Sequence, residues 1–464
     1  MKLVFTKEIN CSLKQTPELR INAMKVSAYV PATKNFVERI SGKVRDKFVL
    51  RESVILLFLK TLFKICQFGF IFLMARYLSQ EDFGDFQFVA GTINLITQPA
   101  VVLTLVVARI GCSFPLEFQL ENIRWFFQQW KALIIALSCA IVLLFVVGDG
   151  VLIEFSKIEA HGSFAVAGIT IVASLVFYYY MGFLQALESF KAIGLLFFLT
   201  GSVTFILGIA VVLGDLGILT VYGTEATARM IALVVTLWLI SKSLPKQSLP
   251  NRRIKFSVPR YSLLLFLSML GFFCAYNMDI FTLKVIFDRT AAGHYMRMDL
   301  VGKLMFLFGS TLAIIIFPRS SKAYESGEDP RFFLLRGTLV FFAGAGLASI
   351  FIIIFQNKIF GIIFGGGYRA DSTVVASIIT ARVFESYIFI LLNYLAAIIN
   401  RWMLYSMLGL VIVQGALLAA NHGSLLQVSV SMAVASVLCT FFLLFLVFVR
   451  APTKRSAFQN AEVK

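Results

Sequence analysis

The sequence predicts an all-α membrane protein that crosses the bilayer about twelve times. Hydrophobic residues make up 59% of its 464 residues, charged residues only 14%, and the mean hydropathy is +0.86. Soluble domains are typically about half apolar and about a quarter charged. A water-facing surface could not be built from this composition, so we expect one polytopic membrane domain and no soluble catalytic domain.

The spans are predicted from continuous apolar runs separated by short polar joints. A helix needs about 20 apolar residues to cross the bilayer, and the period-two alternation of a membrane β-barrel is missing from these runs. We expect spans at residues 54–75, 86–108, 131–155, 163–187, 192–213, 219–240, 261–286, 295–317, 334–356, 371–395, 401–421 and 426–449.

The distribution of charge predicts the orientation of these spans. The formal charge is +17, and with a cytoplasmic N-terminus the basic residues concentrate in the cytoplasmic segments 1–52, 241–260, 318–333 and 450–464. This is the positive-inside pattern of membrane proteins. An even number of spans then places both termini in the cytoplasm. The positive charge is therefore explained by the orientation of the spans in the membrane and by attraction to anionic lipid, and it does not indicate nucleic-acid binding.

The N-terminal leader contains a basic segment with helical periodicity. Val37, Ile40, Val44 and Phe48 recur at helical spacing among lysines and arginines. This pattern is typical of an amphipathic helix that lies on a membrane surface. A solvated arm is an equal alternative.

The joints after the first and the seventh predicted spans share a pattern: Ser or Asp, several residues, glycine, any residue and an aromatic. Ser79 and Asp288 can cap the helix that follows. Gly84 and Gly293 allow another backbone to approach closely. The repeated pattern indicates an internal duplication, of the parallel kind found in transporters.

We therefore expect two bundles of six helices each. The predicted organisation is a basic leader at 1–52, a first bundle at 53–240, a linker at 241–260, a second bundle at 261–449 and a tail at 450–464.

Five short segments, in their order along the chain, carry a resemblance to a known family. They are Ala75–Gly84 (ARYLSQEDFG), Asn277–Phe281 (NMDIF), Gly293–Tyr295 (GHY), Pro318–Arg319 and Phe364–Tyr368 (FGGGY). With them, roughly residues 50–450 resemble the Wzx-type oligosaccharide flippases of the multidrug/oligosaccharidyl-lipid/polysaccharide (MOP) exporter superfamily. The chain departs from that family in its long basic leader and in having lysines where an arginine is more familiar in the first span.

The resemblance implies a MATE-like, V-shaped pair of bundles around a cationic cavity. It implies a transporter of the bacterial inner membrane rather than an enzyme. Its cargo would be an undecaprenyl-pyrophosphate-linked glycan of O-antigen, capsule or exopolysaccharide type, moved to the outer leaflet by alternating access. A polysaccharide polymerase and a chain-length regulator are implied partners. We expect no cofactor and no metal site, with H⁺ or Na⁺ as a possible coupling ion.

Charged residues within the spans are the best candidates for function, because each costs about 2.5–3.5 kcal/mol to insert. Lys60, Lys64 and Gln67 lie at i, i+4 and i+7, on one face of the first span. Two like charges on one stripe suit an anionic ligand such as a pyrophosphate. The alternative for Lys60 is that its side chain snorkels to the lipid headgroups.

Two further pairs are spaced four residues apart and can neutralise themselves on one helix. They are Glu225 with Arg229, and Asp299 with Lys303. We expect structural ion pairs, and keep Arg229 and Lys303 as alternative contacts to the cargo and Glu225 as an alternative coupling group.

The tenth span places Arg382 and Glu385 on one helical face. Arg382 is a second candidate for contact with the anion, and Glu385 a candidate coupling group. Asp279 matches a recurrent acid of the resembled family that could hold a proton or a cation. Its alternative is a salt bridge to Lys284 or to a neighbouring helix. Pro99 within the second span could serve as a hinge, although kinks without such a role are common.

Two other functions remain open. A cation-coupled drug exporter of the same superfamily would need acidic residues in its cavity to bind organic cations. The stripe in the first span, Lys60 and Lys64, is instead basic. A glycan polymerase or acyltransferase would want a catalytic cluster, but His161, His294 and His422 are scattered and no HExxH, phosphate loop or Gly-x-Ser-x-Gly elbow occurs. The six cysteines form no CxxC pair, so neither a disulfide framework nor a zinc site is suggested.

Overall fold

The structure is a computed structural model that describes residues 32–102, 104, 107, 119–187, 189–243, 260–365 and 367–450. The expectations for the start of the leader, for most of the linker and for the tail therefore fall outside the described residues. All regular structure within them is helical, with thirteen α-helices and a final π-helical turn.

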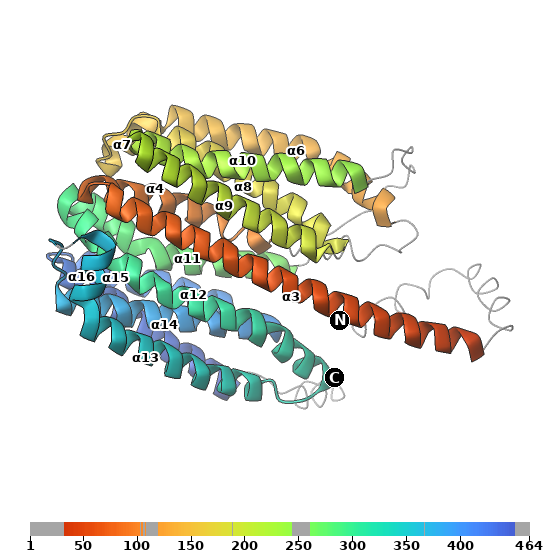
Figure 1. Cartoon of the computed structure of the whole chain (residues 1–464). Helices are drawn as coiled ribbons and strands as arrows, with labels where there is room; N and C mark the ends of the chain where they lie inside the picture. The colour runs from red at the N-terminus through yellow and green to blue at the C-terminus, as the bar shows by residue number, and fades with distance from the viewer. Residues whose placement is uncertain are drawn as a thin grey trace.

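The helices of the first half form one packed group, shown from red to yellow-green in Figure 1. Helix α3 packs on α9, α10 packs on α8 and α9, and α8 contacts α4 and α6. Their bounds are α3 Ala32–Tyr77, α4 Gln80–Thr97, α6 Gln119–Val147, α7 Asp149–Ser156, α8 Ser163–Ala186, α9 Phe190–Gly214 and α10 Gly217–Ser243.

The helices of the second half form the other group, drawn in green to blue in Figure 1. Helix α14 lies at its centre against α12, α13 and α16, while α15 packs between α11 and α16. The bounds are α11 Arg260–Ile286, α12 Arg289–Ser326, α13 Arg331–Phe364, α14 Ser372–Ala397, α15 Trp402–Ala420 and α16 Leu425–Phe445, with the π-helical turn at Leu446–Arg450.

Ten helices are long and apolar enough to cross a membrane, namely α3 and α8 to α16, and the bent pair of α6 and α7 would make an eleventh span. The chain is thus a multi-pass membrane protein by length and composition. Helix α4, at the second predicted span, carries Glu81, Asp82 and Asp85 and ends at Thr97. A turn at residues 98–100 follows and contains Pro99, as expected where proline removes a helical hydrogen bond.

Three elements differ from the predicted bounds. Helix α3 continues without a break through residues 32–52, so these residues extend the first span and do not form a separate helix. Helices α12 and α13 likewise extend beyond the spans predicted at 295–317 and 334–356. Polar residues at the ends of long spans keep helical hydrogen bonding after they leave the apolar region, so hydropathy alone ends these helices too early.

The third predicted span is broken in two. Helices α6 and α7 are bent by 55° at Gly148. The carboxylate of Asp149 accepts hydrogen bonds from the N–H groups of Gly162, Phe164 and Ala165, at 2.9, 3.0 and 3.3 Å. Asp149 therefore ties the start of α7 to the first turn of α8, because the N–H groups there have no intrahelical partners.

The two repeated joints form the expected caps and pack against each other. Ser79 Oγ accepts the N–H of Asp82 at the start of α4, and Asp288 accepts the N–H of Ala291 at the start of α12. A Cβ atom added to Gly84 would lie 3.0 Å from Cα of Gly293. The close approach predicted for both glycines is thus an approach of one joint to the other.

Replacing Gly293 with alanine is expected to push α4 and α12 apart. The added Cβ would lie 1.9 Å from the carbonyl oxygen of Gln80, so the backbone must shift. We expect a loss of about 1–3 kcal/mol in stability, as for other overpacked sites. Thermal unfolding in detergent measures it. Gly361→Ala on α13, where an added Cβ meets no atom within 4 Å, is the matched control, and equal melting temperatures for the two variants would contradict this expectation.

Candidate functional site

The two helix groups meet at one end, which we call the junction: residues 76–85 and 157–159 of the first half against residues 284–297 and 362 of the second. Gln80 Nε2 donates to the carbonyl oxygen of Thr290 at 2.7 Å, and Arg297 donates to that of Leu78 at 2.9 Å. Helix α4 packs against both α11 and α12 here. The polar contacts found between the groups in the described residues all lie in this junction.

The core of the junction is a buried set of ion pairs. Asp85 and Lys284 are each 1% exposed and form a salt bridge. The other oxygen of Asp85 accepts from Arg289 at 2.8 Å, and Arg289 also pairs with Glu159. Lys157 donates to the carbonyl oxygens that end α11 at 3.0 and 3.2 Å. Lys284 thus pairs with Asp85, so the salt bridge to Lys284, one of the two alternatives given for Asp279, is not formed.

Neutralising Asp85 is expected to weaken the junction strongly. Asp85→Asn leaves the buried Lys284 and the half-buried Arg289 without their shared carboxylate, a change that costs about 3–5 kcal/mol when a buried pair is broken. Glu81→Gln is the control, because Glu81 is 46% exposed and lies 3.8 Å from Arg289, where a surface pair contributes about 0–1 kcal/mol. Melting temperatures in detergent compare the two. An Asp85→Asn protein as stable as Glu81→Gln would show that the junction does not depend on this carboxylate.

The first group contains a basic pocket between α3, α9 and α10. Lys64 Nζ donates to Gln67 Oε1 at 3.1 Å, so the predicted stripe on α3 is held together by a hydrogen bond. Gln67 in turn lines a small pocket, together with Phe63, Thr200, Gly201, Thr204, Glu225 and Arg229. Lys60 Nζ lies 5.0 Å from the centre of the Phe197 ring on α9, within cation–π distance.

Glu225 and Arg229, whose spacing predicts an ion pair, attract each other electrostatically but are not joined by a salt bridge within 4 Å. Both side chains line the pocket, and neither forms a hydrogen bond or salt bridge with another described residue. Their opposite charges therefore partly offset each other within the pocket. Of the three cations in the region that we call the basic pocket, only Arg229 lines the cavity itself, beside Glu225. Lys64 reaches the cavity through its hydrogen bond to Gln67, and Lys60 lies next to it over the Phe197 ring.

The second group contains a buried ionic cluster on α11, α12 and α14. The guanidinium of Arg382, 1% exposed, donates to Asp299 at 2.6 Å, to Glu385 at 2.7 Å and to Asp279 at 2.5 Å. It also donates to the carbonyl oxygen of Tyr276 at 2.8 Å. These contacts occupy four of its five N–H groups. We therefore correct the expectation that Arg382 contacts the anionic cargo, because its donors are taken by carboxylates in this conformation.

The remaining members complete the cluster. Lys303 pairs with Asp299 at 3.0 Å, which confirms the predicted i, i+4 pair. Tyr295 donates its hydroxyl to Asp279 at 3.1 Å. Asp279 is thus bound to a neighbouring helix, the second of its two predicted alternatives.

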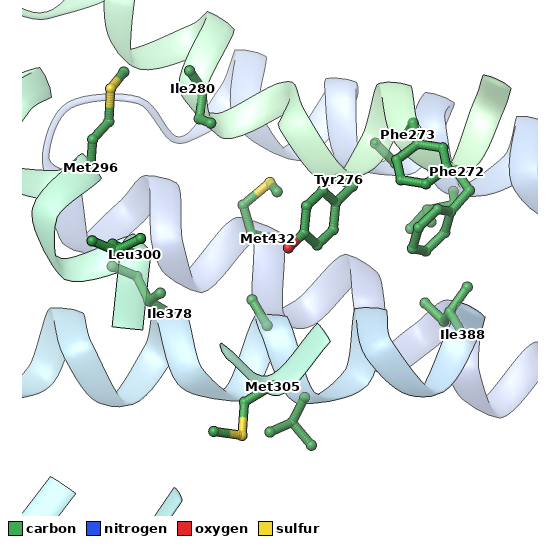
Figure 2. Close-up of a cluster of buried hydrophobic side chains, with 14 of the residues drawn as sticks. Phe272, Phe273, Tyr276, Ile280, Met296, Leu300, Met305, Ile378, Ile388 and Met432 are labelled. Carbon is green, nitrogen blue, oxygen red and sulfur yellow. The ribbon is translucent and has the colours of Figure 1, made fainter. Parts of the chain in front are cut away.

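An apolar layer surrounds this cluster. Figure 2 shows Tyr276, Leu300, Ile378 and Met432 gathered from four helices, with Phe272 and Phe273 beside them. The guanidinium of Arg382 lies 4.7 Å from the centre of the Tyr276 ring. Charges in such a low-dielectric setting need paired partners, which explains why each carboxylate of the cluster lies against a cation.

Solved membrane transporters share this arrangement of helices. The lipid II flippase MurJ in an inward closed conformation aligns with a TM-score of 0.65, covering 86% of this chain and 87% of its own at 13% identity. An inward-facing multidrug resistance MATE family transporter of the MOP superfamily gives 0.61, over 85% and 98% at 13% identity. The chain has the MATE-like transporter fold. A MATE in complex with MaD5 gives 0.58, over 89% and 96% at 14% identity.

No protein-family model and no curated protein matches the sequence. Within the MATE-like fold, the predicted site residues divide into the basic pocket of the first half and the ionic cluster of the second. Pro99 lies apart from both, after α4. Sequence reasoning missed Asp85 and Arg289 as functional residues. A signal for Asp85 was present, since it is an acid directly beside a predicted span.

Proposed function

We propose that this chain is a Wzx-type flippase that moves an undecaprenyl-pyrophosphate-linked oligosaccharide from the cytoplasmic to the outer leaflet by alternating access. The observation that carries the proposal is the basic pocket on α3, α9 and α10. Buried or half-buried cations within the span of a membrane helix are costly and mark the path of a charged substrate. Three cations against one carboxylate leave an excess of two positive charges, which suits a pyrophosphate diester.

The cargo would contact Lys60, Lys64, Gln67 and Arg229. Lysine supplies point charges with rotatable donors and arginine a planar fork, and both bind phosphate oxygens well. Thr200 and Thr204 lie on the same wall, but their hydroxyl groups donate to the carbonyl oxygens of Leu196 and Thr200, so the donors to the phosphate come from the charged side chains and Gln67. A glycan of O-antigen, capsule or exopolysaccharide type would extend from the pyrophosphate, and a polymerase and a chain-length regulator would act on it after transport.

The proposal places the junction at the outer face of the bacterial inner membrane. The positive-inside pattern supports this, because the basic leader, linker and tail then lie in the cytoplasm. The two six-helix bundles at 53–240 and 261–449 would be closed at the outer end and would separate from each other at the cytoplasmic end.

A drug exporter of the same superfamily is the second candidate, supported by the similarity to multidrug MATE transporters. An organic cation would need unengaged acids. In the described residues, Asp279, Asp299 and Glu385 are paired with cations already, and Glu225 shares its pocket with Arg229. The basic pocket therefore favours the anionic cargo.

Deletion of the gene tests the proposal. Surface polysaccharide is measured together with the access of an externally added glycan-modifying probe to the lipid-linked repeat units. Loss of surface glycan with repeat units held on the cytoplasmic face is expected. Repeat units that accumulate on the outer face would instead indicate a polymerase, and an unchanged glycan would favour the drug exporter.

A further inference from the structure

We propose that Arg382 acts as a built-in cation that keeps metal ions out of the ionic cluster, and that the ion exchanged there is a single proton held by Glu385. The inference rests on the proposed transport function, for which it names the coupling ion.

The carboxylates do not form a site for a metal ion. A hard cation such as Ca²⁺ takes six to eight oxygen ligands at about 2.3–2.6 Å. Here the guanidinium occupies the centre of the cluster, and three carboxylates and the Tyr276 carbonyl oxygen point at its N–H groups. In the part of the chain that the structure describes, no group of His, Cys, Asp or Glu residues is spaced to hold a metal ion. The residues present therefore do not fit Na⁺ as a coupling ion at this place.

The net charge of the cluster is balanced when one proton binds. Three carboxylates, on Asp279, Asp299 and Glu385, face only the two cations Arg382 and Lys303. An excess negative charge buried in a membrane protein is costly, and a buried carboxyl group neutralises itself by binding a proton. Uptake of one proton from water converts one carboxylate to a neutral carboxyl group and leaves the cluster without net charge.

The hydrogen bonds point to Glu385 as the group that takes this proton. Both oxygens of Asp299 are bound by cations, and those of Asp279 accept from Arg382, from Tyr295 and from the N–H of Ile280. In Glu385 one oxygen accepts from Arg382, whereas Oε1 has only a 3.5 Å contact with the hydroxyl of Ser436 on α16. Oδ2 of Asp299 has no hydrogen-bond partner, but the Lys303 ammonium lies 3.0 Å from it, whereas Oε1 of Glu385 has only the Ser436 hydroxyl at 3.5 Å.

The charged, polar and titratable groups of the cluster around Glu385 come from α11, α12, α14 and α16. Helix α11 contributes Asp279 and Tyr276, α12 contributes Asp299, Lys303 and Tyr295, α14 contributes Arg382, and α16 contributes the hydroxyl of Ser436. A protonated Oε1 could donate to Ser436, whereas the carboxylate can only accept from it. Gain and loss of the proton thus change the contact between α14 and α16.

Infrared spectroscopy and thermal unfolding of the purified full-length protein, without cargo, test the inference. We expect a carbonyl band of a protonated carboxyl group at neutral pH that Glu385→Gln removes and Glu225→Gln retains. We also expect Glu385→Gln to leave the melting temperature unchanged, since the amide resembles the neutral acid, while Asp299→Asn lowers it by several degrees. Replacing choline by Na⁺ at equal ionic strength should shift neither the band nor the melting temperature.

A saturable, Na⁺-specific rise in the melting temperature of the wild-type protein that Asp279→Asn abolishes would overturn the inference, whether or not the other variants fold. So would a carboxyl band that persists unchanged in Glu385→Gln. Because no glycan is used, neither result depends on the identity of the cargo. Failure of the proposed flippase activity would appear only in the cellular experiment.

Discussion

Replacing Arg382 with methionine is expected to destabilise the second helix group more than any other single change considered. Methionine keeps much of the side-chain length but removes the cation shared by Asp279, Asp299 and Glu385. Removing one partner of a buried ion pair costs about 3–5 kcal/mol, because the remaining charge is left unpaired. We expect a melting temperature in detergent that falls by several degrees or a protein that does not fold.

The control for this prediction is Arg336→Met on α13. Arg336 is exposed and lies over the Phe332 ring at 4.1 Å, so its loss should cost about 1 kcal/mol or less. Adding Asp299→Asn to Arg382→Met should recover part of the lost stability, since it removes one of the unpaired charges. A single Arg382→Met variant as stable as Arg336→Met would show that the cluster is not held by the guanidinium.

Replacing Lys64 with alanine is expected to reduce glycan export strongly in a protein that still inserts into the membrane. Lys64 lies within α3 and is hydrogen-bonded to Gln67 at the edge of the basic pocket. A hydrogen bond to a charged group contributes about 1.5–3 kcal/mol, and each 1.4 kcal/mol corresponds to about tenfold in affinity. We therefore expect export to fall roughly tenfold to hundredfold. Lys64→Arg should retain more activity because it keeps the charge.

Lys358→Ala is the matched control for Lys64→Ala. Lys358 lies on the exposed face of α13, 6.0 Å from the Phe355 ring, and removing it should leave export unchanged. Export is measured as surface polysaccharide, with membrane content of each variant determined by immunoblotting. Full export by an inserted Lys64→Ala protein would exclude Lys64 from the path of the pyrophosphate.

Much of the fold is readable from the sequence, because hydropathy and capping are local properties. Residue type alone predicts two of its features. Ser79 and Asp288 cap the helices that follow them, and Gly84 and Gly293 allow two backbones to approach closely. The break at Gly148 was missed because the apolar run continues through it. Its cause is the tertiary contact of Asp149 with the start of α8, which no local pattern reveals.

The site was only partly predictable, for a similar reason. Helical spacing correctly joined Asp299 with Lys303, since both lie on one helix. It could not show that Arg382 would be surrounded by acids from two other helices, or that Lys284 would cross to Asp85 in the other half. For Glu225 and Arg229 the spacing placed both side chains in one pocket, but it could not show that no close salt bridge joins them. The periodicity of a helix shows which residues share one of its faces, whereas the residues that they contact on other helices depend on how the helices pack.

Translocation by the purified protein in proteoliposomes tests the central claim most directly. A polyprenyl-pyrophosphate-linked oligosaccharide is placed in the inner leaflet, and its appearance outside is followed by the access of an externally added glycan-modifying enzyme. We predict modification well above that of protein-free vesicles, reduced by Lys64→Ala and unaffected by Lys358→Ala. Transfer no faster than in protein-free vesicles, or equal transfer by the two variants, would contradict the proposal that the basic pocket carries the pyrophosphate across the membrane.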